Sequence, residues 1–109
     1  MSWTVYIAYF CGGFFLANAI PHLVAGMMGQ GFPSPFAKPP GKGLSSPLVI
    51  VLWGAFNLTV GYLLTVRVGS FDLRNTSHVV VAGLGGLLIA VALAYHLGKM
   101  NGTNSKEKI

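Results

Sequence analysis

Residues 78–98 read HVVVAGLGGLLIAVALAYHLG, a run of 21 residues that contains no Lys, Arg, Asp or Glu. A helix of about 20 apolar residues is long enough to cross the hydrocarbon core of a bilayer, and it satisfies its backbone hydrogen bonds internally. Two other stretches, about 3–28 and 47–68, are similarly apolar and carry no charged residue before the last turn. The sequence therefore predicts an all-α membrane protein with three transmembrane helices.

The composition of the chain agrees with a membrane environment. Of the 109 residues, 53% are hydrophobic and only 8% are charged, whereas about a quarter of the residues in soluble domains are charged. This balance excludes an ordinary water-soluble domain. The length predicts a single three-helix transmembrane domain over residues 1–98, followed by a polar tail, 99–109, that we expect to be mobile. Cys11 is the only cysteine, so neither an intrachain disulfide nor a cysteine metal site is expected.

Start signals mark two of the predicted helices. Ser46 precedes Pro47, and serine at the N-cap followed by proline at the first helical position favours a helix start. We expect Ser77 to cap the third helix in the same way.

A Pro/Gly-rich loop separates the first two helices. Residues 30–46 contain four prolines and three glycines, which disfavour regular structure. The loop is longer than a turn requires, so it is either a stiff connector that fixes the angle between two helices or a binding element. In the second interpretation Phe32 and Phe36 lie in the bilayer interface, while Lys38 and Lys42 reach lipid phosphates or a partner.

The distribution of Lys and Arg predicts the orientation, because cytoplasmic segments near helix ends carry the excess of these residues. Three spans place the first loop and the C-terminus on one side, which holds five lysines: Lys38, Lys42, Lys99, Lys106 and Lys108. The other side holds Arg67 and Arg74. We therefore expect the N-terminus outside and the C-terminus in the cytoplasm. The net charge of +5 then reflects topology and attraction to anionic lipid, and the scattered basic residues do not indicate nucleic-acid binding.

Small residues repeat every four positions on two of the predicted helices. The third helix carries this ladder at Ala82, Gly86, Ala90, Ala94 and Gly98, and the first helix carries one at Gly13, Ala17, Ala25 and Gly29. Rows of small residues let helix backbones approach closely in lipid, where association depends on close packing. Two interpretations stay open. The ladders pack against each other, or one closes the three-helix unit while the other meets a second copy or a foreign subunit.

Polar residues inside the predicted spans are costly to bury in lipid and call for an explanation. Asn18 and His22 lie four positions apart on one helix face, and Asn57 lies near the middle of the second span. We expect Asn18 and Asn57 to form an interhelical hydrogen bond. The alternative is that these three side chains line a polar path through the membrane.

The histidines raise the question of a cofactor. His22 and His96 are expected at similar depth on helices that run in the same direction, where two imidazoles could hold haem or a metal ion. The sequence offers no third ligand nearby, so we expect no metal and no cofactor. His78, at the start of the third helix, is expected to face solvent.

Several segments together carry a resemblance. They are Asn18-x-x-Pro21-His22, the loop Phe32-Pro-Ser-Pro-Phe-Ala-Lys-Pro-Pro-Gly-Lys-Gly-Leu-Ser-Ser-Pro47, and Trp53-Gly54 with Asn57. In these segments the chain resembles small, uncharacterised three-helix proteins of the bacterial inner membrane. The resemblance covers roughly the first two helices. It implies a multi-pass protein of the inner membrane and brings no activity with it.

The function is constrained mainly by the chemistry that the sequence lacks. The chain shows no nucleophile with a base, no carboxylate pair and no convincing metal set, so an enzyme is not expected. The favoured interpretation is an accessory or structural subunit that packs against a larger membrane complex through its small-residue faces. One alternative is a homo-oligomeric small-molecule transporter or channel with a path at Asn18, His22 and Asn57. A second is a haem or metal carrier that uses His22 and His96.

Overall fold

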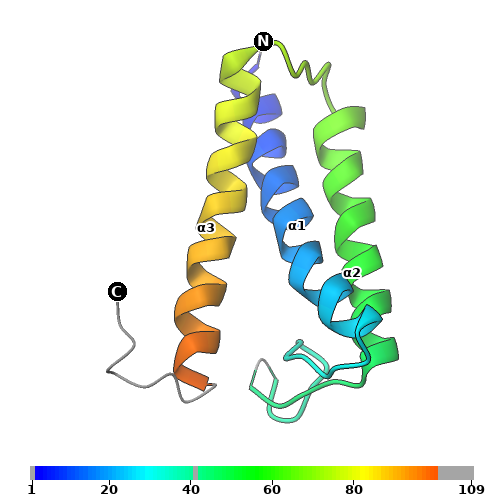
Figure 1. Cartoon of the computed structure of the whole chain (residues 1–109). Helices are drawn as coiled ribbons and strands as arrows, with labels where there is room; N and C mark the ends of the chain where they lie inside the picture. Colours follow the sequence, from blue (N-terminus) through cyan, green and yellow to red (C-terminus); the bar gives the residue numbers. More distant parts are fainter. Residues whose placement is uncertain (1, 41, 101–109) are drawn as a thin grey trace.

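The computed structural model describes residues 2–40 and 42–100, and its long elements are all helices (Figure 1). They are α1 (Trp3–Met27), α2 (Pro47–Tyr62), which continues into the π-helical turn η1 (Leu63–Arg67), and α3 (Thr76–Met100). Three segments, Trp3–Met27, Pro47–Arg67 and Thr76–Lys99, are long and apolar enough to cross a membrane. The three predicted helices are therefore confirmed, and no strand occurs in these two described ranges. The predicted tail at 99–109 falls mostly outside them.

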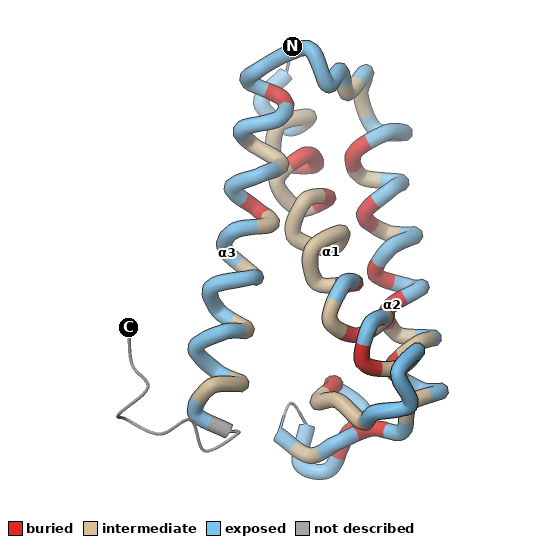
Figure 2. Tube along the Cα trace, viewed as in Figure 1, coloured by how far each residue is buried: buried red, intermediate tan, exposed pale blue. Residues whose placement is uncertain are grey.

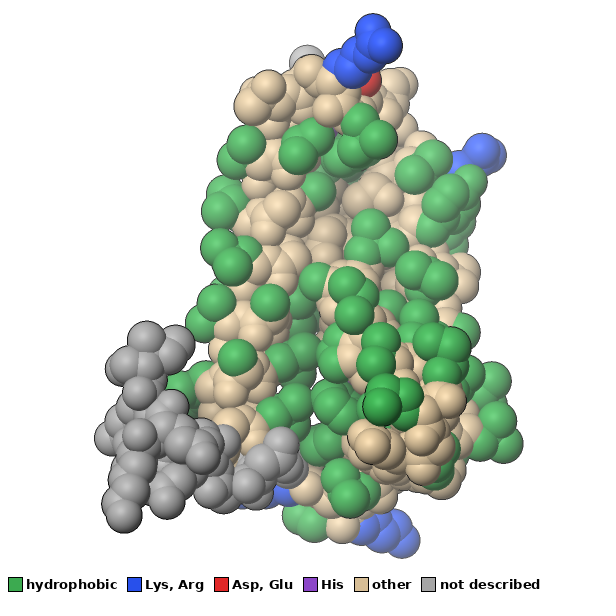
Figure 3. Space-filling view, in the orientation of Figure 1, with side chains coloured by type: hydrophobic (Ala, Val, Ile, Leu, Met, Phe, Trp, Pro, Cys, Tyr) green, Lys and Arg blue, Asp and Glu red, His purple; other side chains and the backbone are tan. Residues whose placement is uncertain are grey.

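The surface of the helices is apolar. Figure 3 shows hydrophobic side chains along the visible face of the helices, with Lys and Arg side chains at the two ends. Each helix exposes large aliphatic side chains, for example Ile20 on α1, Leu52 on α2 and Leu88 on α3. Such a surface, carried by three long helices, is typical of a multi-pass membrane protein.

Side-chain oxygens cap the N-termini of the second and third helices. Ser46 caps α2 as predicted, because its Oγ accepts a hydrogen bond from the backbone N–H three residues later (3.3 Å). The predicted cap of α3 at Ser77 is wrong, since the helix begins at Thr76. Asn75 Oδ1 instead accepts hydrogen bonds from the backbone N–H groups of Ser77 (3.0 Å) and His78 (3.3 Å). One asparagine oxygen thus satisfies two N–H groups that have no partner inside the helix.

The end of α1 is a Schellman motif centred on Gly29. The N–H of Gly29 donates to Gly26 O (3.0 Å), and the N–H of Gln30 donates to Ala25 O (2.9 Å). Gly29 has a φ of 74°, a left-handed conformation that favours glycine. A Cβ at this position would meet nothing within 4 Å. Gly29 therefore ends the helix and is not a rung of a packing ladder, whereas Ala25 is buried.

α1 lies between the other two helices (Figure 1). It packs against α2 and η1 on one side and against α3 on the other, while α2 and α3 form no comparable interface. Each span contains an apolar window of 18 residues. The buried share of this window is 33% in α1, 28% in Pro47–Arg67 and only 11% in α3. Most of α3 is accordingly pale blue in Figure 2. The third helix is thus held mainly by α1 and leaves most of its surface exposed.

Leucines of α1 fit over glycines of α2. A Cβ at Gly54 would lie 2.8 Å from Leu23 Cγ, and a Cβ at Gly61 would lie 2.6 Å from Leu16 Cγ. Real Cβ atoms do not approach other atoms so closely, so glycine is needed at both positions. The glycines are seven residues apart, as are the leucines, and this is about two helical turns. The spacing of seven is visible in the sequence, but these leucines and glycines were not among the predicted packing residues.

The second span closes with a π-helical turn. Thr65 Oγ1 donates to Gly61 O (2.7 Å), a bond of a threonine hydroxyl back into its own helix. A Cβ at Gly12 of α1 would collide with the methyl group of Thr65. The span predicted over about 47–68 is therefore present as Pro47–Arg67, and its last turn is π-helical, with a buried threonine that packs on α1.

α1 and α3 meet backbone to backbone. A Cβ at Gly13 would collide with the carbonyl group of Ala82, and a Cβ at Gly85 would collide with the carbonyl group of Phe10. Close approach of this kind is what small residues provide in lipid. Gly13 and Ala82 belonged to the predicted ladders, whereas Gly85 did not.

The two predicted ladders meet each other over only part of their length. A Cβ at Gly86 would lie 3.4 Å from the Cβ of Ala17, so these two rungs are in contact. Ala90 and Ala94 are exposed, and Gly98 is half-buried. The reason is geometric, because a helix has about 3.6 residues per turn and each step of four residues turns the side chain about 40° too far. The C-terminal rungs of α3 therefore turn away from α1.

Candidate functional site

An amide pair joins α1 to α2 inside the bundle. Asn18 Nδ2 donates to Asn57 Oδ1 (2.9 Å), and Asn57 Nδ2 donates to Trp53 O (2.8 Å). Asn57 is fully buried. The predicted contact between the two asparagines is therefore present. It occupies polar groups that a transport path along the same residues would need.

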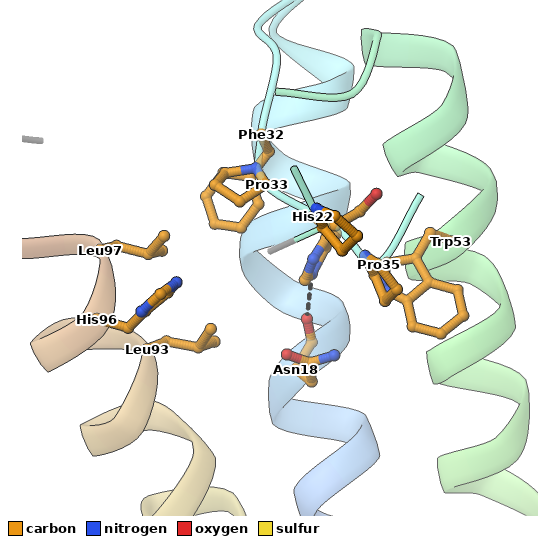
Figure 4. A pocket seen from close by; sticks show the side chains of 11 residues that line it. Asn18, His22, Phe32, Pro33, Pro35, Trp53, Leu93, His96 and Leu97 are labelled. Atoms are coloured by element: carbon orange, nitrogen blue, oxygen red, sulfur yellow. Dashed lines mark hydrogen bonds between the residues drawn. The ribbon is translucent and has the colours of Figure 1, made fainter. Parts of the chain in front are cut away.

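A backbone carbonyl fixes the orientation of both amides. Because Trp53 O can only accept, Asn57 must present its Nδ2 to it, which turns Asn57 Oδ1 toward Asn18. Asn18 must then donate through Nδ2, so its own Oδ1 points away from α2. In Figure 4 this oxygen lies on the side of α3. Asn18 thus offers an acceptor to the space between α1 and α3.

His22 is buried beside this pair. Its Nδ1 lies 2.7 Å from Asn18 O, and since a carbonyl only accepts, Nδ1 carries the proton and donates. In the neutral ring Nε2 therefore keeps its lone pair and is an acceptor. Phe32 packs edge-on against the imidazole with 4.8 Å between ring centroids. His22 is left only 4% exposed.

The Pro/Gly-rich loop folds back on itself at this end of the bundle. Phe32 and Ser45 exchange two backbone hydrogen bonds (3.3 and 2.9 Å) in an isolated antiparallel bridge. The hydroxyl groups of Ser34 and Ser45 bond to each other at 2.6 Å, and both serines are buried. Because the bridge joins the two ends of the loop, Phe32 is turned inward against His22 and not toward the bilayer interface.

The other loop residues expected to contact lipid or a partner lie on the surface. Phe36 is 62% exposed and packs edge-on against Trp53 with 5.2 Å between ring centroids. Lys38 and Lys42 are both exposed. These three side chains are accessible to a headgroup or a partner.

A cavity of about 420 Å³ lies between the folded loop, α1, α2 and the C-terminal part of α3 (Figure 4). Its apolar lining consists of Phe32, Pro33, Pro35, Pro40, Trp53, Leu93 and Leu97, and its polar lining consists of Asn18, His22, Ser34 and His96. The volume falls in the range of small-molecule sites, about 300–1,000 Å³. His22 and His96, expected at similar depth, thus line the same cavity from α1 and α3. His22 is buried and His96 is exposed.

The histidine pair does not form a complete metal site with its neighbours. Over residues 2–40 and 42–100, no group of three or more His, Cys, Asp or Glu side chains could hold a metal ion. A cavity lined mainly by apolar and aromatic side chains with a few polar groups is instead typical of sites for organic molecules.

A second polar cluster lies at the opposite end, around His78. The prediction that His78 faces solvent is wrong, because it is 3% exposed. Its Nδ1 accepts a hydrogen bond from the backbone N–H of Asp72 (3.0 Å), and its ring packs against Tyr9 with 4.9 Å between centroids and against Phe71 with 5.8 Å. The connection between the second and third spans therefore folds over the ring. Tyr9 Oη and His78 Nε2 are buried without a hydrogen-bond partner among the described residues.

No family model, curated protein or solved structure matches this chain. The class that the fold defines is a small all-helical protein with three helices long and apolar enough to cross a membrane.

Proposed function

We propose that this chain is an accessory subunit of the bacterial inner membrane that packs α3 against a larger membrane complex. The low burial of α3 carries the proposal, since 11% of its membrane-spanning window is buried against 33% for α1. α3 is attached to the bundle mainly along α1, so most of its surface meets lipid or another protein.

The residues on the free side of α3 favour a protein over lipid. Ala90 and Ala94 are exposed one turn apart, and they continue the small-residue row beyond the contact with α1. A neighbouring helix gains close backbone contact at such a row, whereas fluid lipid chains do not need it. Leu87 and Val91, each 58% exposed, flank the two alanines and would pack around the incoming helix.

The charge distribution supports an outside N-terminus and a cytoplasmic C-terminus. Lys38 and Lys42 belong to the loop at the same end of the bundle as Lys99, while Arg67 and Arg74 belong to the opposite end (Figure 1). Basic residues near helix ends concentrate on the cytoplasmic side. The folded loop and the cavity would then lie toward the cytoplasmic face.

Native mass spectrometry tests the accessory role. The tagged full chain is purified from native membranes in lipid discs, and the mass of the intact particle is measured. We expect a particle that contains foreign subunits. A discrete homo-oligomer would favour the transporter or channel alternative, and a monomer alone would contradict both.

Matched variants of α3 test the docking face. The double variant Ala90→Leu with Ala94→Leu should lose the partner, because leucine removes the groove that a neighbouring helix needs. Both alanines are exposed, so the fold of the chain should not change. Ala92→Leu makes the same change at an exposed position outside the row and should retain the partner. Equal retention of the partner by these variants would contradict docking through α3.

A further inference from the structure

We propose that the cavity beside His22 binds a membrane-soluble ring compound that donates a hydrogen bond through a hydroxyl group, the chemistry of a quinol. This inference does not depend on how α3 packs in a complex. It rests on the shape of the cavity, on the direction of the hydrogen bonds in its wall and on its access to the bilayer.

The shape and lining of the cavity favour an apolar ring. Phe32 and Trp53 bring aromatic surfaces to it from the loop and α2, and Leu93 and Leu97 bring aliphatic surfaces from α3 (Figure 4). Aromatic rings pack well in offset or edge-on contact with such side chains. The cavity of about 420 Å³ is large enough for a substituted single ring with part of a tail.

Two groups in the polar wall of the cavity, on His22 and Asn18, can accept hydrogen bonds. His22 donates a hydrogen bond from Nδ1 to the carbonyl oxygen of Asn18, which leaves Nε2 as an acceptor. Asn18 donates a hydrogen bond from Nδ2 to Asn57 Oδ1, which leaves its own Oδ1 as an acceptor. Two neighbouring acceptors complement a ligand that carries O–H donors. An oxidised quinone offers only carbonyl oxygens, so these two groups favour the reduced form.

The helices that line the cavity allow us to propose entry from the bilayer. Trp53 of α2 and Leu97 of α3 lie on two helices that form no comparable interface with each other. In the proposal the ligand enters laterally between these helices, a route that does not cross the folded loop. Ligands that are themselves membrane-soluble take such a route most readily.

The test uses the full chain in lipid discs with one tryptophan as reporter. The chain has two tryptophans, and Trp3 is 72% exposed at the start of α1. The variant Trp3→Phe leaves Trp53, which lines the cavity, as the only indole. The probes are tetramethylhydroquinone, kept reduced under nitrogen, and its dimethyl ether, which has the same ring without a hydroxyl donor. Quenching of Trp53 fluorescence gives a dissociation constant for each probe.

We expect the hydroquinone to bind about tenfold more tightly than the ether, the effect of one or two net hydrogen bonds. The variant His22→Asn separates hydrogen bonding from shape. Its amide nitrogen can keep the bond to the Asn18 carbonyl in place of Nδ1, while its oxygen takes the place of the ring carbon Cδ2 and does not reach the position of Nε2. Affinity for the hydroquinone should fall about fivefold in this variant, while affinity for the ether should stay the same. The unchanged ether affinity also reports an intact cavity.

Leu93→Phe is the matched control for cavity shape, because a larger side chain should weaken both probes alike and preserve their ratio. Equal binding of the two probes to the starting chain would overturn the proposal. An unchanged ratio in His22→Asn would overturn it as well. If neither probe quenches Trp53, the cavity does not take such a ring and the proposal fails.

Discussion

A methyl group at Gly85 should separate α3 from α1. The added Cβ would collide with the backbone carbonyl of Phe10, and neither backbone can yield locally because both are helical. α3 then has to move by on the order of 1 Å, and a gap of that size forfeits a quarter to a half of the dispersion energy between facing atoms. We expect Gly85→Ala to lower the free energy of unfolding by about 1–3 kcal/mol, the usual range for overpacking.

Gly83 provides the control for this prediction. It lies on the same helix two residues earlier, and a Cβ there would meet nothing within 4 Å. Gly83→Ala should leave the free energy of unfolding unchanged or raise it by up to about 1 kcal/mol, because alanine favours helix over glycine. Titration of mixed micelles with a denaturing detergent, followed by tryptophan fluorescence, measures both variants. Equal stabilities would refute the backbone contact between α1 and α3.

Three further predictions use the same unfolding measurement. Asn57→Leu removes two buried amide hydrogen bonds and should cost about 1–2 kcal/mol; an unchanged midpoint would contradict the interhelical bond. Tyr9→Phe removes a buried hydroxyl that has no hydrogen-bond partner among the described residues, so stability should stay the same or rise by about 1 kcal/mol. A fall in the free energy of unfolding by about 1 kcal/mol would mean that the hydroxyl is hydrogen-bonded in the membrane. Asn75→Ala should cost about 1 kcal/mol through loss of the cap, with Ser77→Ala as a neutral control.

The helices and the amide pair could be predicted because both depend on local features of the sequence. The three spans could be identified because each is a continuous apolar run of sufficient length that lacks charged residues over nearly all of it. Asn18 and Asn57 could be paired because each lies near the middle of its span, where few partners other than another amide exist. Depth in the membrane thus restricts which polar groups can meet.

The details that failed depend on geometry beyond the local pattern. The ladder that continues through Ala90 and Ala94 to Gly98 repeats every four residues, but a straight helix returns to the same face after about 3.6 residues. His78 was expected to face solvent because it begins a helix, and its burial follows from the way the preceding loop folds over it. The inward turn of Phe32 depends on a bridge to Ser45, thirteen positions away in a stretch without periodicity.

The two interfaces of α1 differ in how firmly they fix the neighbouring helix. This difference would let α3 rock against α1 while α2 stays in place. On the α2 side, leucines seated over glycines and the amide bond fix the register, since the next equivalent fit is two helical turns away. On the α3 side, small residues bring the two backbones together near Gly85, and His78 packs against Tyr9 at the N-terminal end of α3. His96 lies eleven residues further along α3, a lever arm of about 16 Å at about 1.5 Å per residue. A rocking of about 10° at the crossing would move the backbone of His96 by about 3 Å, and thereby widen or narrow the cavity while His22 stays in place.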